Sequence, residues 1–137
     1  FKIYVQQVMD NAKIMCETIL SRGIDVVTGK TENHIVLVDL RKKEITGKDL
    51  EKALGDVNIT VNKNAVPNDP RSPFVTSGIR IGVPAVTTRG LKEKEMEVIA
   101  TLIDQVLMNA DDEKTIERTK QTVKEMMLNY PLYPELS

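Results

Sequence analysis

The fold of this chain is decided by one short apolar run, Ile35-Val36-Leu37-Val38, in a sequence of 137 residues. Consecutive apolar and β-branched residues over so short a stretch predict a β-strand that is covered on both faces. Three more stretches have strand character: residues 24–28, 59–61 and 78–82. Turn-forming residues at 29–33 separate the first of these stretches from the apolar run. The sequence therefore predicts a small sheet of short strands.

Helical periodicity surrounds these strands. Apolar residues spaced by three and four predict a helix over residues 2–22. Thr46 can cap a short helix that Gly55 ends, and two longer helices are predicted from about Lys92 and after Asp112. The order of helix, short strands, helix, strand and two helices predicts an α+β fold, in which a small, mainly antiparallel sheet is covered by helices.

Composition excludes several classes of partner and site. The formal net charge is −1, from 19 basic and 20 acidic residues, so no overall field attracts nucleic acid or an anionic membrane. No segment has the roughly 18 consecutive apolar residues that span a bilayer, and the N-terminus does not resemble a signal peptide. We therefore expect a cytoplasmic protein with neither a nucleic-acid partner nor a membrane anchor.

One cysteine and one histidine limit the possible chemistry. Cys16 cannot form an intramolecular disulfide, and with His34 alone it cannot build a metal cluster, so no metal site is expected. Cys16 lies on the apolar stripe of the first predicted helix, which favours a small buried hydrophobe over a nucleophile. His34 stands beside a turn at a strand start, which favours a structural imidazole over a catalyst.

Residues 62–90 differ in composition from the rest of the chain. They hold four of its six prolines, which exclude a long helix or a central strand in the first half of the stretch. They also hold several large apolar residues, which are unusual in a solvated linker. A long ordered loop of this kind inside a compact domain is usually functional.

Arg80 is the strongest candidate functional residue. Neighbouring side chains of a strand point to opposite faces, so Ile79 and Ile81 are expected to pack inward while Arg80 points outward. A guanidinium presents a planar fork of donors that matches a carboxylate or phosphate. The alternative is a structural arginine that pairs with an internal acid such as Asp69 or Asp39, and the pattern alone leaves both open.

A second signal is the triplet Asn62-Lys63-Asn64, which precedes the proline-rich loop. Asparagine amides both donate and accept hydrogen bonds, so they suit the edge of a heterocyclic ligand. They equally suit turns, and the sequence pattern favours a turn here.

Residues 58–90 closely resemble the C-terminal part of bacterial serine hydroxymethyltransferase, above all in the run Ser72-Pro73-Phe74-Val75-Thr76-Ser77-Gly78-Ile79-Arg80-Ile81-Gly82. The likeness continues at residues 29–34 and 40–54 and covers essentially the whole chain. It implies that residues 1–137 form a single C-terminal small domain of a fold-type I pyridoxal-phosphate enzyme. In that domain, residues 1–22 are a connecting helix and residues 62–90 are a substrate- and folate-side loop with a short strand. The start at Phe1, directly in helical periodicity, favours a fragment of a longer protein.

The resemblance also implies a chemistry. The family interconverts serine and glycine, passes the one-carbon unit to tetrahydrofolate and uses pyridoxal phosphate as an electron sink. Arg80 is implied to hold the substrate carboxylate, and Asn64 to contact the folate pteridine. Ser72, Pro73 and Phe74 match a loop that lines the folate site. The full-length protein is expected to be a homodimer or larger.

The chain departs from the family pattern mainly in what it lacks. The lysine that binds the cofactor and the residues that hold its phosphate and ring belong to the family's larger N-terminal domain, and Lys63 does not replace that lysine. We therefore expect no catalytic and no cofactor-binding residue here, and no activity in the isolated chain. Smaller departures are Lys30 and Val83, where the family often has Gly and Thr.

Two alternatives remain: a free-standing amino-acid-binding or regulatory module, and a structural domain with Arg80 in an internal ion pair.

Overall fold

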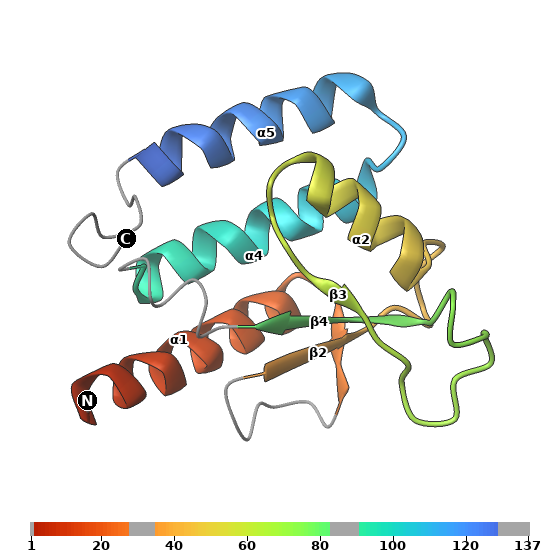
Figure 1. Cartoon of the computed structure of the whole chain (residues 1–137), viewed down its shortest axis with the longest axis horizontal. Coiled ribbons are helices and arrows are strands. Elements are labelled where there is room, and N and C mark those ends of the chain that lie inside the picture. Colours follow the sequence, from red (N-terminus) through yellow and green to blue (C-terminus); the bar gives the residue numbers. More distant parts are fainter. Residues whose placement is uncertain (1, 28–34, 83–90, 129–137) are drawn as a thin grey trace.

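The computed structural model describes residues 2–27, 35–82 and 91–128 and shows an α+β fold (Figure 1). Its elements in chain order are α1 (Lys2–Ser21), β1 (Asp25–Val26), β2 (Ile35–Asp39), α2 (Gly47–Asp56), β3 (Asn62–Lys63), β4 (Gly78–Gly82), α4 (Glu93–Met108) and α5 (Glu113–Leu128). The predicted α+β class is confirmed, and β4 coincides with the strand predicted at residues 78–82. The turn at 29–33, His34, Lys30, Val83 and residues 83–90 of the predicted loop lie outside the described residues.

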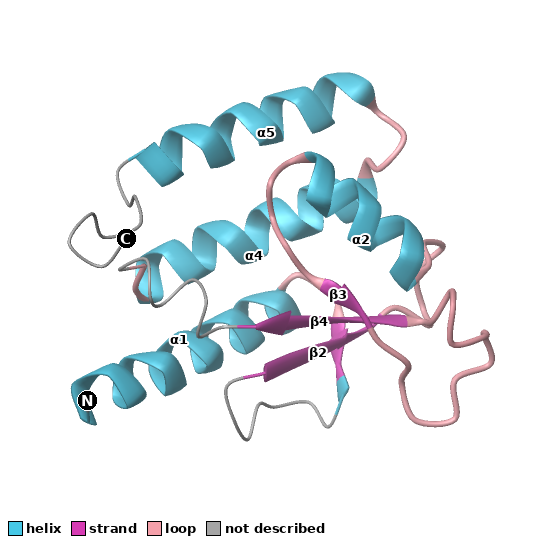
Figure 2. Cartoon of the chain, viewed as in Figure 1, coloured by secondary structure: helices cyan, strands magenta, loops and turns pink. Residues whose placement is uncertain are grey.

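The four strands form one antiparallel sheet in the order β1-β2-β4-β3. In the register of the two longest strands, Val36 lies opposite Ile81, Leu37 opposite Arg80 and Val38 opposite Ile79. Helices α1, α4 and α5 are stacked from bottom to top in Figure 1, and Figure 2 shows the short strands beside this stack, with α2 above them. The predicted small antiparallel sheet with covering helices is confirmed.

The two faces of the sheet differ in burial. Val36, Val38 and Ile79 are fully buried and Ile81 is 4% exposed, so their shared face is sealed by the helices. Leu37 points to the other face and is only half-buried. The prediction that the apolar run is covered on both faces is therefore wrong for Leu37: within the described residues the helices cover one face, which we call the inner face, and leave the outer face accessible.

The core joins the inner face to α1, α2 and α4. Apolar residues of α4 are buried as the periodicity predicts, and Cys16 of α1 is buried with them. Helices α1 and α4 pack along each other, and Arg22 Nε lies 2.7 Å from Asp104 Oδ2 across their ends. The periodicity over residues 2–22 also includes Val5 and Leu20, but both are exposed, so α1 buries fewer of its apolar residues than predicted.

Strand β3 begins later than predicted. The backbone N–H of Ile59 still donates to the carbonyl of Leu54, at 2.9 Å, so it closes the end of α2 and cannot pair with a strand. The left-handed residue that ends this turn is Asn58, with φ of 67°, whereas Gly55 lies inside the helix. Strand pairing consequently starts at Asn62 instead of residue 59.

None of the helices in the described part of the chain is both long and apolar enough to cross a membrane.

Candidate functional site

Arg80 lies in the centre of the outer face. Its ladder neighbours are Leu37 on β2 and Asn62 on β3, so these three residues form a row across the sheet. Ile79 and Ile81 are buried and Arg80 is exposed, which confirms the predicted alternation. Among the described residues no ion pair or hydrogen bond engages the Arg80 guanidinium. The arginine is thus held on a strand, and the described residues leave its fork of donors unoccupied.

The two acids that the sequence offered as internal partners of Arg80 are bound elsewhere. The Asp39 carboxylate is held by Arg41, whose Nη2 lies 2.7 Å from Oδ2 and whose Nε lies 3.1 Å from Oδ1. The hydrogen bonds from the Arg41 guanidinium lower the pKa of Asp39 against the opposing effect of burial. Asp69 serves the loop before β4. The structure therefore does not support the internal-pair alternative with either acid.

Asp69 organises the loop between β3 and β4. Its Oδ2 accepts from the backbone N–H of Ser77 at 2.7 Å and of Val66 at 3.2 Å. Its Oδ1 accepts from the Ser77 hydroxyl at 2.7 Å and from the Arg71 N–H at 2.9 Å. Burial raises the pKa of Asp69, but these hydrogen bonds to the charged form outweigh it and lower the pKa to about 2. One ionised side chain thus fixes the beginning, the middle and the end of the loop.

The same loop is fastened to the start of α2. The N–H of Gly47 donates to the Thr76 carbonyl at 3.1 Å, and the N–H of Lys48 donates to the Val75 carbonyl at 2.9 Å. Thr76 has a φ of 59°, a left-handed conformation that is rare for a β-branched residue. Gly47 is required here, because a Cβ would collide with the Thr76 hydroxyl and the Gly78 carbonyl. The loop and α2 are therefore built as one unit.

The residues predicted on the folate side are distributed along this loop. Asn64 follows β3, and its side-chain Nδ2 donates to the Ala65 carbonyl at 2.9 Å. Ser72 and Pro73 are exposed, and Phe74 is 80% exposed. The loop bonds described above hold the segment that carries them on both sides, so a large aromatic ring projects from a fixed backbone.

One expectation about this segment is corrected. Asn62 and Lys63 do not form a turn but pair with Arg80 and Ile79 as strand β3. A Cβ on Gly78 would lie 2.7 Å from the Val38 carbonyl oxygen and 2.8 Å from that of Asn64, so what comes close to this glycine is the chain's own backbone. Sequence spacing alone does not distinguish that close approach from one by a ligand.

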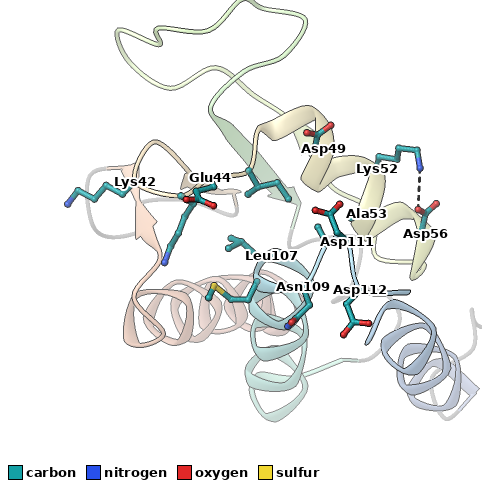
Figure 3. Close-up of a pocket in the computed structure, with 14 residues that line it drawn as sticks. Lys42, Glu44, Asp49, Lys52, Ala53, Asp56, Leu107, Asn109, Asp111 and Asp112 are labelled. Atoms are coloured by element: carbon teal, nitrogen blue, oxygen red, sulfur yellow. Dashed lines mark hydrogen bonds and ion pairs between the residues drawn. The ribbon is translucent and has the colours of Figure 1, made fainter. Parts of the chain in front are cut away.

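Sequence reasoning missed a hollow of about 920 Å³ away from Arg80, drawn in Figure 3. It lies between α2, the connection before α2 and the turn from α4 to α5. Its charged lining consists of Lys42, Lys43, Glu44, Asp49, Lys52, Asp56, Asp111 and Asp112. Two of these, Lys52 and Asp56, pair with each other at 3.5 Å. In the described ranges no three side chains of His, Cys, Asp or Glu are grouped to hold a metal.

The described residues do not fit pyridoxal phosphate. The lysine that binds this cofactor must be withdrawn from water to lose its proton near neutral pH. None of the lysines whose exposure the structure describes is buried. Lys63, on the loop side of the sheet, is half-buried with its Nζ 3.9 Å from Glu51 Oε1. No step of a reaction can therefore be assigned to a cofactor held by this part of the chain.

Comparison with known proteins places this geometry in a family. A family model described as serine hydroxymethyltransferase matches residues 1–103. Serine hydroxymethyltransferase 1 of Ralstonia nicotianae is 56% identical over 133 residues, which are 97% of this chain and 32% of that protein. Serine hydroxymethyltransferases of Ralstonia pickettii and Legionella pneumophila are each 55% identical over the same shares. The chain spans about a third of the length of the curated relatives it matches. It belongs to the serine hydroxymethyltransferase family, and its assignment to fold type I follows from that membership.

Proposed function

We propose that this chain is the C-terminal small domain of a cytoplasmic, homodimeric serine hydroxymethyltransferase, which interconverts serine and glycine and passes the one-carbon unit to tetrahydrofolate. The observation that carries the proposal is Arg80, exposed on the outer face and unengaged among the described residues of a family member. The rest of the enzyme is proposed to hold the pyridoxal phosphate, since the lysines described here are unsuited to it.

Arg80 is proposed to anchor the substrate carboxylate. A guanidinium can form two parallel charge-assisted hydrogen bonds to a carboxylate, which fixes the orientation of the substrate as well as its position. Because Arg80 sits in the middle of a hydrogen-bonded strand, its backbone cannot shift without breaking the pairing with β2 and β3. A rigid anchor of this kind would orient the breaking bond at the substrate Cα, a proximity and orientation effect.

The loop before β4 is proposed to supply part of the folate site. Phe74 presents an aromatic ring to solvent on a segment that Asp69 and the start of α2 hold in place. An exposed aromatic ring on a fixed backbone is suited to pack on a flat heterocycle at low entropic cost. Asn64 offers the oxygen of its amide and the second N–H of Nδ2, because one N–H is donated to the Ala65 carbonyl. Ser72 and Pro73 directly precede Phe74.

The anchor is tested by Arg80→Lys in the full-length enzyme. Serine is titrated while the absorbance of the bound cofactor is followed. We expect serine affinity to fall by about tenfold or more, because one ammonium cannot replace two charge-assisted hydrogen bonds worth roughly 1.5–3 kcal/mol each. Arg22→Lys is the matched control, because Arg22 also meets a carboxylate but joins α1 to α4. Undiminished affinity in Arg80→Lys would refute the anchor role.

The proposal that the rest of the enzyme holds the cofactor is tested on the 137-residue chain itself. Purified in the presence of pyridoxal phosphate and then dialysed, it is expected to keep no cofactor absorbance and to show no activity. The alternative function, a free-standing amino-acid-binding module, is supported by the same observation, that no group in the described part of the chain engages the Arg80 guanidinium. Calorimetric titration with serine decides between the two, since measurable binding by the chain alone would support the module.

A further inference from the structure

The outer face carries acids close to Arg80. Asp39 follows Leu37 by two residues on β2, so both belong to the same face, and Leu37 is the ladder partner of Arg80. Asp39 is therefore a diagonal neighbour of Arg80, at a spacing of roughly 7–8 Å that long side chains can bridge. Asp25 lies opposite Asp39 on β1 and extends the acidic row. An arginine in such a position would ordinarily be expected to pair with the nearest carboxylate.

A second arginine occupies the Asp39 carboxylate instead. Besides its side-chain bonds to Asp39, Arg41 donates its backbone N–H to Oδ1 at 3.0 Å. Its Nη1 also donates to the Pro67 carbonyl at 3.3 Å, which ties the guanidinium to the loop before β4. The Asp39 side chain is 11% exposed in this arrangement. Arg41 thus donates hydrogen bonds to both oxygens of the Asp39 carboxylate.

The neighbouring acids have partners as well. Asp25 meets Lys42 at 3.4 Å, and Asp69 is surrounded by the donors of its own loop. The hydrogen bonds with Asp39 raise the pKa of Arg41, and the charges of Asp39, Asp69 and Asp25 add to that rise. Among the described residues none of these three carboxylates bonds the Arg80 guanidinium, because each is held by another partner.

We propose that Arg41 is a positioning residue for the Arg80 site: it occupies the Asp39 carboxylate and so keeps Arg80 from closing an internal ion pair, which leaves the Arg80 fork open to an external carboxylate. The inference rests on the proposed function, because it assigns the external group to the substrate. It adds a cause for the openness of Arg80, which the strand alternation alone does not give.

The test compares four variants of the full-length enzyme by serine titration: Arg41→Met, Asp39→Asn, the double variant and Arg22→Met. In Arg41→Met, Arg80 is expected to pair with the vacated Asp39 carboxylate in about nine-tenths of the molecules. Serine affinity falls with the fraction of enzyme whose Arg80 is free, so it is expected to weaken about tenfold. The double variant is expected to return within about twofold of wild type, since an amide cannot hold Arg80 as an ion pair. Asp39→Asn alone should leave serine affinity unchanged.

Arg22→Met is the matched control, because Arg22–Asp104 has the same 2.7 Å separation and similar side-chain exposure but lies between α1 and α4. It should leave serine affinity within about twofold of wild type. Wild-type affinity in Arg41→Met, or a loss that Asp39→Asn does not reverse, overturns the proposal. Should Arg41→Met fail to fold, the double variant and Arg41→Lys still decide: Arg41→Lys keeps a cation on Asp39 and must retain most of the affinity.

A second measurement separates this inference from the proposed function. In nuclear magnetic resonance spectra of the 137-residue chain, Arg41→Met should shift the Nε–Hε signal of Arg80 towards that of a paired guanidinium, and Asp39→Asn should remove the shift. Absence of the shift overturns the role of Arg41, whatever Arg80→Lys does to serine binding. A shift without loss of serine affinity overturns the anchor role of Arg80, and with it the assignment of the external carboxylate.

Discussion

Ile79 and Arg80 are neighbours in one strand, yet they belong to two different regions of the molecule. Ile79 is fully buried in the inner face, where apolar contacts with the helices fix it. Arg80 stands on the outer face, where the described acids are paired with other partners and none of the described residues bonds its guanidinium. The comparison teaches that the two-residue period of a strand gives this sheet two different faces: one is sealed by apolar packing, and the other is arranged by charge pairing.

The largest expected effect on stability comes from the inner face. Ile79→Ala should lower the free energy of unfolding of the chain by about 3–4 kcal/mol, because it removes buried methyl and methylene groups and leaves a cavity in the core. Arg80→Ala should change it by less than about 0.5 kcal/mol, as is usual for an exposed side chain without partners. Urea denaturation followed by circular dichroism measures both. Comparable losses in the two variants would contradict the division between the faces.

The loop before β4 gives a second, smaller effect that depends on pH. Asp69→Asn should cost about 2 kcal/mol at neutral pH, because an amide offers one acceptor to donors that now share two oxygens. The pKa of Asp69 is lowered in the folded chain from 3.8 to about 2, so the ionised form stabilises the fold above pH 4. That contribution is lost as the pH falls through about 2.

Denaturation of wild type and Asp69→Asn at a series of pH values measures this difference. The two curves should run parallel above pH 4 and converge as the pH falls towards 2, where wild-type Asp69 itself takes up a proton. Asp49→Asn is a control, since Asp49 is exposed and makes no side-chain bond among the described residues. A gap between wild type and Asp69→Asn that does not change with pH would mean that the carboxylate charge plays no part.

The inner face was largely predictable from sequence because it depends on periodicity. Spacing of apolar residues gives α1 and α4 within a residue or two, and alternation gives the opposite directions of Ile79 and Arg80. The prediction failed at two places, one because of a local backbone hydrogen bond and the other because no element in the described residues covers the outer face of the sheet. Ile59 donates to Leu54 and delays β3, and nothing in the described residues covers Leu37 fully.

The outer face was less predictable because its partners are set by tertiary contacts. The sequence shows Arg80, Asp39 and Asp69, but not that Arg41 takes the first acid and the loop donors take the second. Both choices depend on the register of β2 against β4 and on the path of the loop. The folate-side residues were assigned only from the resemblance to a family, and the roles of Asn64 and Phe74 stay predictions.

The smallest expected effect concerns the junction of the two regions at the start of α2. Thr46 Oγ1 accepts from the Asp49 N–H at 3.1 Å, so Thr46→Ala should cost about 1 kcal/mol, the usual loss for a helix cap. Because the next two N–H groups are already taken by the Thr76 and Val75 carbonyls, the helix start stays docked on the loop when the cap is lost. Thr60→Ala, at an exposed position without partners in the described residues, should cost less than about 0.5 kcal/mol in the same urea titration. A Thr46→Ala loss well above 2 kcal/mol would show instead that the cap also holds the loop, and that inner-face packing and the outer-face loop are coupled through α2.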